Sequence, residues 1–241
     1  MAKTGGTTLN HIINNNYEKE ATYHIYTADQ KEKTKMFNEI SLKNPVCVQG
    51  HFPFGVHKYF KNKSEYVTLI RNPIDRIISE YYFIQSFSWP PWLDKKNPAH
   101  QKIVNFSFEE HIRQPGNKNK QVRFISGNQK IQLNKTDLDT AIHNINNFFV
   151  VAGITEKFDE SLFLMKEKLD WKNVHYQRTN VTKKRPRLND LSSNLIKLIE
   201  KNNRLDIELY NFAKKRLNDQ IHQLDSEDKS KLKSFLSQAN N

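Results

Sequence analysis

Two short segments of the chain combine residue types that bind phosphate groups. The first, the Lys3 loop (residues 3–8), consists of Lys3, Thr4, Gly5, Gly6, Thr7 and Thr8. It offers an ammonium group, hydroxyl groups, and glycines that let backbone N–H groups approach a ligand. Apolar residues follow at helical spacing, so we expect a helix whose first N–H groups face an anion. Because the lysine precedes the glycines, the loop differs from those of ATP- and GTP-hydrolysing proteins.

The second segment runs from Arg71 to Ser79 and reads Arg-Asn-Pro-Ile-Asp-Arg-Ile-Ile-Ser. Arg71 ends an apolar run, and Pro73 suits the first turn of a helix. Ser79 follows Arg71 by eight residues, a separation of roughly two helical turns. A strand, a tight turn and a helix in this order would let Arg71 and Ser79 converge on one phosphate.

Both segments need strands and helices to hold them in place. Short β-branched and aromatic runs predict strands over residues 22–26, 45–49, 66–70 and 148–154. Helical spacing predicts helices over residues 73–82, 156–169, 188–199 and 205–217. The alternation of strands with helical or loop-like sequence favours a parallel sheet covered by helices.

Other segments carry weaker signals. Turn-forming residues predict loop-rich regions over residues 86–105 and 115–134, and prolines among lysines predict an exposed basic loop over residues 178–187. The polar residues 225–241 predict a frayed helix or a mobile tail. We therefore expect one domain over residues 1–217, followed by a polar helix or tail over residues 218–241.

Composition narrows the possible functions. The 241 residues include 38 Lys and Arg against 26 Asp and Glu, a formal net charge of +12. Such charge attracts polyanions, and it leaves nucleic acid, an anionic lipid surface and an acidic glycan open. No apolar run reaches the roughly 20 residues of a membrane helix, so we expect no stable membrane insertion. The single Cys47 excludes an internal disulfide and a thiolate metal cluster.

The order of the motifs resembles that of the sulfotransferases that use 3′-phosphoadenosine 5′-phosphosulfate (PAPS). Among these it is most similar to the glycan O-sulfotransferases related to heparan sulfate and uronyl 2-O-sulfotransferases. Residues 3–9 resemble that family's 5′-phosphosulfate loop, Gln49-Gly50-His51 its catalytic histidine segment, and residues 66–83 its 3′-phosphate strand and helix. The resemblance implies a nucleotide-kinase-like α/β fold of P-loop type, with three layers and a central parallel sheet flanked by helices.

The resemblance also implies a reaction, the transfer of a sulfuryl group from PAPS to a hydroxyl of a glycan or another alcohol, which leaves adenosine 3′,5′-bisphosphate (PAP). His51 would be the general base, and Lys3 would stabilise charge on the departing oxygen. No metal is required by this chemistry, and no nucleic acid partner is expected. The residues implied to hold the donor are Lys3, Thr4, Gly5, Gly6, Thr7, Thr8, Arg71, Ser79, Arg178, Lys183 and Lys184.

The chain departs from the family pattern in two places. Related animal enzymes often read His-Gly-His where this chain has Gln49-Gly50-His51, so His51 alone is left as the base, with His57 as second choice. In the family a buried strand precedes the phosphosulfate loop, whereas Met1 and Ala2 stand at that place here. We therefore expect a first strand that is missing or truncated, either because Met1 is an internal methionine of a longer natural chain or because the gene prediction is truncated.

Three alternatives remain beside the sulfotransferase reading. A basic nucleic-acid-binding protein would explain the charge, a kinase or nucleotide hydrolase would share the topology, and an inactive relative would bind PAP without transfer. As written, the chain suits the cytoplasm of a bacterium or a product of a virus, and the Golgi lumen only if an N-terminal anchor has been lost. The acceptor and the oligomeric state stay open.

Overall fold

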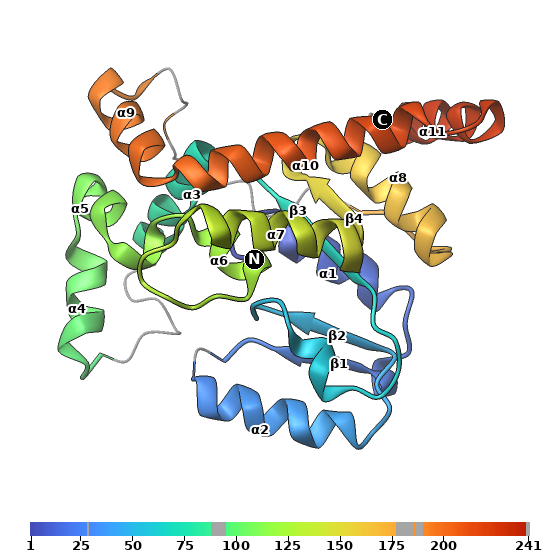
Figure 1. Cartoon of the computed structure of the whole chain (residues 1–241), viewed down its shortest axis with the longest axis horizontal. Helices are drawn as coiled ribbons and strands as arrows, with labels where there is room; N and C mark the ends of the chain where they lie inside the picture. Colours follow the sequence, from blue (N-terminus) through green and yellow to red (C-terminus); the bar gives the residue numbers. More distant parts are fainter. Residues whose placement is uncertain (28, 88–94, 177–185, 187–189, 240–241) are drawn as a thin grey trace.

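The computed structural model describes residues 1–27, 29–87, 95–176, 186 and 190–239 (Figure 1). Its strands are β1 (Thr22–Ile25), β2 (Cys47–Gly50), β3 (Tyr66–Ile70) and β4 (Phe149–Ile154). Its helices are α1 (Gly6–Asn14), α2 (Gln30–Ser41), α3 (Pro73–Gln85), α4 (Pro98–Asn105), α5 (Phe108–Arg113), α6 (Lys120–Ser126), α7 (Lys135–Phe148), α8 (Phe158–Leu169), α9 (Ser193–Asn202), α10 (Arg204–His222) and α11 (Ser226–Ala239). Short 3-10 turns are η1 (Lys19–Ala21), η2 (Val56–Tyr59), η3 (Pro115–Asn117) and η4 (Thr155–Lys157).

The four strands predicted from the sequence are confirmed, and so is their parallel direction. β1 pairs with β2, and β3 pairs with β4, both in parallel. One central sheet was expected, yet among the described residues the strands form two separate two-stranded sheets. The mixed α/β class holds, and each of β2 and β3 has one edge with no strand beside it in this part of the chain.

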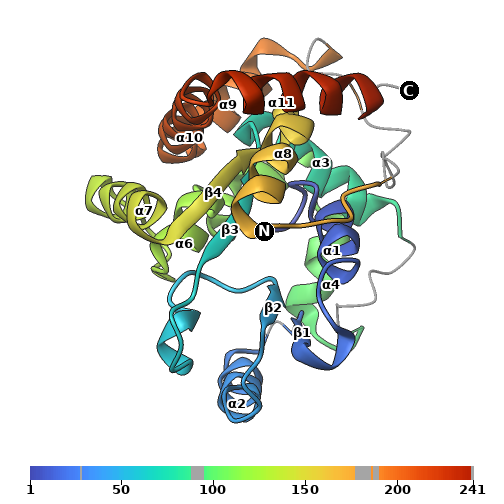
Figure 2. The same cartoon turned by 90° about the vertical axis from the view of Figure 1, so that its right-hand side faces the viewer.

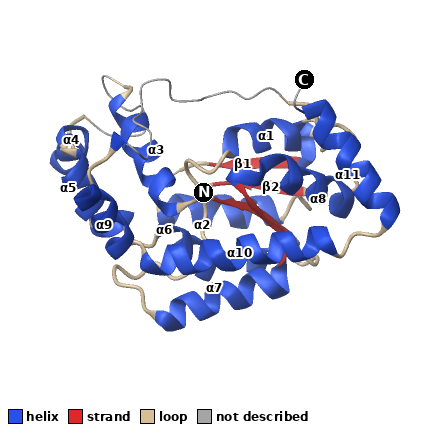
Figure 3. Ribbon diagram, turned by 90° about the horizontal axis from the view of Figure 1, so that it is seen from above, coloured by secondary structure: helices blue, strands red, loops and turns tan. Residues whose placement is uncertain are grey.

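Helices cover the β3–β4 pair on both faces, which gives the fold its layers. Figure 2 shows α1 on one side of these strands and α6 and α7 on the other, and Figure 3 shows α10 on the same side as α7. The main core lies here, where Val151 and Ile154 of β4 and Leu209 of α10 are fully buried. Such burial on both faces is typical of parallel strands.

The other two clusters of buried residues are smaller. Ile25 of β1 packs with Phe37 and Ile40 of α2, which lies against the β1–β2 pair (Figure 1). Ile77 of α3 and Ile112 of α5 pack together with α9 in the third cluster. The β1–β2 pair thus has an apolar core of its own, separate from the core around β3 and β4.

The expectation about loops was wrong, whereas the helical alternative for the C-terminal segment is confirmed. The regions expected to be loop-rich contain α4 and α6, and α6 forms because remote residues hold its first turn, as described below. Residues 226–239 form helix α11, and this helix is held against the protein because Leu232 is buried in the main core and Phe235 packs against Phe163. The division of the chain at residue 217 stays a prediction. No helix in the described ranges is long and apolar enough to cross a membrane.

Candidate active site

The Lys3 loop turns sharply into α1. Lys3 has φ 65° and Gly5 has φ 88°, so both adopt the left-handed conformation that glycine tolerates best. Gly5 is the N-cap of α1 and provides no side-chain cap, which leaves the first N–H groups of the helix available to a ligand. Thr4 is buried, and its hydroxyl donates to the carbonyl of Met1 at 3.1 Å.

Thr155, directly after β4, holds the loop against the end of β3. Its hydroxyl oxygen lies 2.9 Å from the carbonyl oxygen of Thr4 and 3.2 Å from that of Ile70. One side chain therefore connects the Lys3 loop to the strand that leads into Arg71. Sequence reasoning gave Thr155 no role, although a hydroxyl residue at the end of a predicted core strand was a signal for one.

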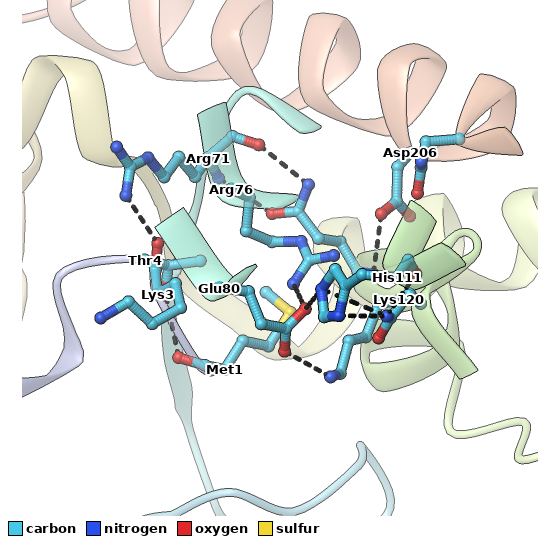
Figure 4. Close-up of polar contacts among 12 residues, drawn as sticks. Met1, Lys3, Thr4, Arg71, Arg76, Glu80, His111, Lys120 and Asp206 are labelled. Atoms are coloured by element: carbon cyan, nitrogen blue, oxygen red, sulfur yellow. Dashed lines mark hydrogen bonds and ion pairs between the residues drawn. The ribbon is translucent and has the colours of Figure 1, made fainter. Parts of the chain in front are cut away.

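Arg71 connects the two phosphate motifs. Its Nη1 donates to the carbonyl of Lys3 at 3.0 Å, across 68 positions of sequence (Figure 4). Its backbone is held by the fully buried Gln121, whose Oε1 accepts from the Arg71 N–H at 2.9 Å and whose Nε2 donates to the Arg71 carbonyl at 2.8 Å. The structure thus brings the Lys3 loop and the end of β3 to one place, and it adds Gln121, which the sequence did not reveal.

The next residues predicted to bind the donor lie on and beside α3. Ser79 is buried on this helix, in the same strand–turn–helix unit as Arg71. The ammonium of Lys3 lies 3.6 Å from the centre of the Phe83 ring, a cation–π contact with the same helix. Three of the residues predicted to bind the donor therefore lie together: Arg71 and Ser79 belong to the β3–α3 unit, and Lys3 contacts it. The other residues predicted to bind the donor lie outside the described residues, namely Arg178, Lys183 and Lys184.

His51 follows β2 and is half-buried. Its N–H donates to the carbonyl of Ile25 at 3.0 Å, and its ring meets that of Tyr26 edge-on at 5.2 Å. Its Nδ1 is buried and has no hydrogen-bond partner among the described residues. Burial, with a smaller contribution from the charge of Lys120, lowers the pKa of His51 to about 4. The imidazole is therefore neutral at pH 7 and able to accept a proton.

His57, the second choice for the base, has a packing role. Its backbone N–H and its Nδ1 both lie 2.9 Å from the hydroxyl of Tyr66. Its ring stacks on Phe148 with centres 5.1 Å apart, and Phe54 lies against it at 5.2 Å. One ring nitrogen of His57 is thus engaged within an aromatic cluster, which favours His51 as the proton acceptor.

A buried charge cluster lies beside the start of the Lys3 loop (Figure 4). Glu80 contacts Arg76 at 3.0 Å and Lys120 at 2.6 Å. Burial alone would raise the pKa of Glu80, but the charges of Lys120 and Arg76 outweigh it and hold the pKa well below its usual range. Burial lowers the pKa of His111 to about 4, so its approach to Glu80 at 4.0 Å is not an ion pair at neutral pH.

This cluster contains more donors than acceptors. Arg76 is 1% exposed, and its Nε and Nη2 have no hydrogen-bond partner among the described residues. Arg76 and Lys120 carry two positive charges against the single carboxylate of Glu80. The site therefore carries an excess of positive charge next to the Lys3 loop, which suits an anionic ligand.

The position of Gln121 depends on α10. Asp206 is fully buried and accepts from the N–H groups of Gln121 at 3.0 Å and Val122 at 2.8 Å. Asn119, with φ 47°, accepts from the N–H of Asp206 at 3.3 Å, and its own N–H donates to Asn203 at 3.1 Å. The first turns of α6 and α10 thus satisfy each other's backbone groups. The described residues contain no group of three or more His, Cys, Asp or Glu side chains placed to hold a metal ion.

Comparison with known proteins connects this geometry to one family. The family model described as "Sulfotransferase family" matches residues 1–213. Over 189 residues the chain is 29% identical to the heparin sulfate O-sulfotransferase of Drosophila melanogaster, covering 70% of this chain and 53% of that protein. Heparan sulfate 2-O-sulfotransferase 1 of Cricetulus griseus and of Homo sapiens are each 27% identical over 153 residues, or 58% of this chain and 42% of theirs. The chain spans about half the length of the curated relatives it matches.

Proposed function

Because the chain belongs to the sulfotransferase family, we propose that it transfers a sulfuryl group from PAPS to a hydroxyl group of a glycan. One observation carries the proposal, the hydrogen bond of 3.0 Å from Arg71 Nη1 to the carbonyl of Lys3. It joins two phosphate-type motifs into one site, and a donor with phosphate groups at both the 5′ and the 3′ positions needs two such motifs side by side. The motif resemblance and the family match agree on this class.

The residues of the site fit such a donor. The uncapped first turn of α1 presents N–H groups to the 5′-phosphosulfate, beside the hydroxyls of Thr7 and Thr8. Arg71, directly after β3, and Ser79 on α3 hold the 3′-phosphate. The unpartnered donor atoms of Arg76 add positive potential nearby. When bound, PAPS supplies the sulfuryl group and a bisphosphate leaving group, while the protein supplies position and charge.

His51 has the properties of a proton acceptor for the acceptor hydroxyl. With a pKa of about 4 its imidazole is unprotonated at pH 7, and it lies close enough to Lys120 of the buried charge cluster for that charge to lower its pKa. Lys3, which now contacts Phe83, would have to turn toward the departing oxygen to stabilise its charge. Unbranched lysine side chains make such a change readily.

An acidic glycan suits the charge of the protein. The net charge of +12 favours a polyanionic acceptor at low ionic strength. The names of the matched relatives, heparin and heparan sulfate O-sulfotransferases, point to the same class of acceptor. We therefore propose a sulfated or carboxylated polysaccharide as the acceptor, with the position of sulfation left to experiment.

A transfer assay tests the proposal. The protein would be incubated with ³⁵S-labelled PAPS and with heparan sulfate, desulfated heparan sulfate, chondroitin or a neutral glucan. We expect label on an acidic glycan, its loss in His51→Ala, and no loss in His143→Ala, a histidine on α7 outside the site.

Two other outcomes have distinct meanings. Stabilisation by PAP without label on any acceptor would contradict the catalytic proposal and leave an inactive PAP-binding relative. Salt-sensitive binding of RNA with no response to PAP would contradict the whole proposal in favour of a nucleic-acid-binding protein.

A further inference from the structure

Helix α2 begins beside the proposed base. Ile25, the last residue of β1, pairs with Gly50, the last residue of β2. Tyr26 and His51 follow these two residues and are therefore neighbours, with ring centres 5.2 Å apart. Only residues 27–29 separate Tyr26 from α2. The first turn of α2 thus lies near His51, at the carboxyl end of the β1–β2 pair, which is the end where parallel sheets bind ligands.

Packing fixes which face of α2 turns toward the β1–β2 pair (Figure 1). Phe37 is 3% exposed, and its ring lies edge-on to that of Phe52 with centres 5.4 Å apart. Phe52 follows His51 directly. Lys33 precedes Phe37 by four residues, so the two side chains share one face of the helix. Lys33 is accordingly half-buried, whereas Lys35 is exposed. The face that packs near His51 therefore includes Lys33.

The charge of Lys33 reaches the imidazole of His51. Burial is the main cause of the low pKa of His51, and the charges of Lys120 and then Lys33 lower it further. Two cations from separate elements, α6 and α2, thus stand near the same ring. Lys120 already has a negative partner, since its Nζ lies 2.6 Å from Oε1 of Glu80. Lys33 is therefore the cation near His51 that is better placed to bind a ligand.

The surroundings of Lys33 leave its charge without a negative partner. The neighbouring Glu32 accepts a hydrogen bond from the hydroxyl of Thr27, and Lys35 pairs with Glu39 at 3.8 Å. Among the described residues no carboxylate forms an ion pair with Lys33. A cation near the start of a helix also gains nothing from the helix dipole, which favours negative charge there. Neither an ion pair nor helix stability therefore accounts for this lysine.

We propose that Lys33 is a specificity-determining residue, which binds a carboxylate or sulfate group of the acceptor beside the hydroxyl that His51 activates. This inference rests on the proposed function and extends it, because it assigns recognition of the acidic group to one side chain of α2. An ammonium on a flexible stem forms a charge-assisted hydrogen bond with such a group. A neutral sugar offers Lys33 no negative partner, so acidic acceptors bind more tightly.

Binding of a heparan sulfate hexasaccharide tests this assignment without any transfer reaction. Calorimetric titration at about 150 mM salt would compare wild type, Lys33→Gln, Lys33→Arg and the exposed control Lys35→Gln. We expect Lys33→Gln to weaken binding by about tenfold, the size of one charge-assisted contact, and Lys35→Gln to change it by less than about twofold. Lys33→Arg keeps the charge and should retain most of the affinity. Glutamine and arginine suit a helix as well as lysine does, so each variant remains folded.

Nuclear magnetic resonance of the histidine rings distinguishes a cation beside His51 from a distant one. The His51 signal is identified by its loss in His51→Ala, and its pH titration is followed with and without the hexasaccharide. In the free protein Lys33→Gln should raise the pKa of His51, because a cation near the ring is removed, and Lys35→Gln should not. In wild type the bound hexasaccharide should raise this pKa as well, and in Lys33→Gln it should do so much less.

The possible results separate this inference from the proposed function. Equal weakening of hexasaccharide binding by Lys33→Gln and Lys35→Gln would overturn the inference, and so would a His51 titration that the hexasaccharide leaves unchanged in wild type. Sulfuryl transfer to a glycan with undiminished affinity in Lys33→Gln would refute the role of Lys33 and leave the proposed function standing. Binding that depends on Lys33, without transfer to any acceptor, would support the role of Lys33 and contradict the proposed function.

Discussion

Gln121 holds the backbone of Arg71 with two hydrogen bonds, one to its N–H at 2.9 Å and one from Gln121 Nε2 to its carbonyl at 2.8 Å. The two residues come from α6 and the end of β3, 50 positions apart. Asp206 of α10 holds the first turn of α6, because its carboxylate accepts from the N–H groups of Gln121 and Val122. The orientation of Arg71, the residue proposed to bind the 3′-phosphate, therefore depends on a buried amide and a buried carboxylate.

Gln121→Ala removes both bonds and leaves two backbone groups of Arg71 without their partner. We expect a loss of about 1–3 kcal/mol in the free energy of unfolding, together with weaker PAP binding because Arg71 is less well oriented. Urea unfolding and calorimetric titration measure the two effects. Gln129→Ala, at an exposed position after α6, is the control. Equal PAP affinity in wild type and Gln121→Ala would contradict the positioning role.

Glu80→Gln breaks the buried charge cluster, because Arg76 and Lys120 then lack their negative partner. We expect a loss of about 3 kcal/mol in the free energy of unfolding at pH 7. Glu109→Gln is the matched control, since Glu109 pairs with Arg113 in an exposed i,i+4 ion pair and both side chains are more than half exposed. That pair should contribute below about 0.5 kcal/mol.

The effect of Glu80→Gln should depend on pH in a defined direction. The folded protein lowers the pKa of Glu80 from its ordinary value of 4.5. The stabilisation is therefore present above pH 4.5 and is lost as the pH falls below that value, where the unfolded chain takes up the proton first. Thermal unfolding from pH 7 to pH 3 should show the two proteins converging. A constant difference would contradict the assignment of the effect to this carboxylate.

Helix α11 offers a test of the C-terminal segment. Leu232→Ala removes a side chain that is 8% exposed in the main core, and we expect a loss of about 2–4 kcal/mol. Lys233→Ala, the next residue on the exposed side of the same helix, should change stability little. Similar unfolding midpoints for the two variants would show that the segment is loosely attached, as its polarity suggested.

The pH dependence of turnover tests the role of His51. A base with a pKa of about 4 in the free enzyme is unprotonated throughout the neutral range. We expect kcat/KM to stay flat from about pH 8 to pH 6 and to fall only as the pH approaches that value, because kcat/KM follows ionisation of the free enzyme. A decline centred on the ordinary histidine value near 6.5 would contradict the buried environment found for His51.

The sequence predicted the local features of this protein better than the remote ones. The four strands and the start of α3 were found because their signals are local, namely apolar runs and Pro73 after Asn72, whose side chain accepts from the N–H groups of Ile74 and Asp75. The sulfotransferase resemblance was confirmed by the family match. Arg71 and Lys3 lie together, and their binding of one donor stays a prediction.

Features that depend on distant partners were missed. Helix α6 was missed, and its region was expected to be a loop. Its first turn is held by Asp206, 85 positions away, and its N-cap Asn119 has a left-handed backbone, so neither feature could be recognised from the local sequence. Gln121 gave no signal of its contacts with Arg71. The position of Thr155 after a predicted strand indicated a role but not its partner Thr4, because that contact exists only in the folded chain. Separation of the strands into two pairs could not be read from periodicity, since each strand pattern is the same in either arrangement.

The most direct test of the central claim measures the contribution of Arg71 to recognition of the 3′-phosphate. Calorimetric titration would compare PAP with adenosine 5′-monophosphate, which lacks that group, in wild type, Arg71→Ala and the exposed control Arg113→Ala. We predict that wild type and the control bind PAP more tightly by at least about tenfold, the value of one charge-assisted contact, and that Arg71→Ala binds the two nucleotides almost equally while remaining folded. Undiminished preference for PAP in Arg71→Ala would contradict the account.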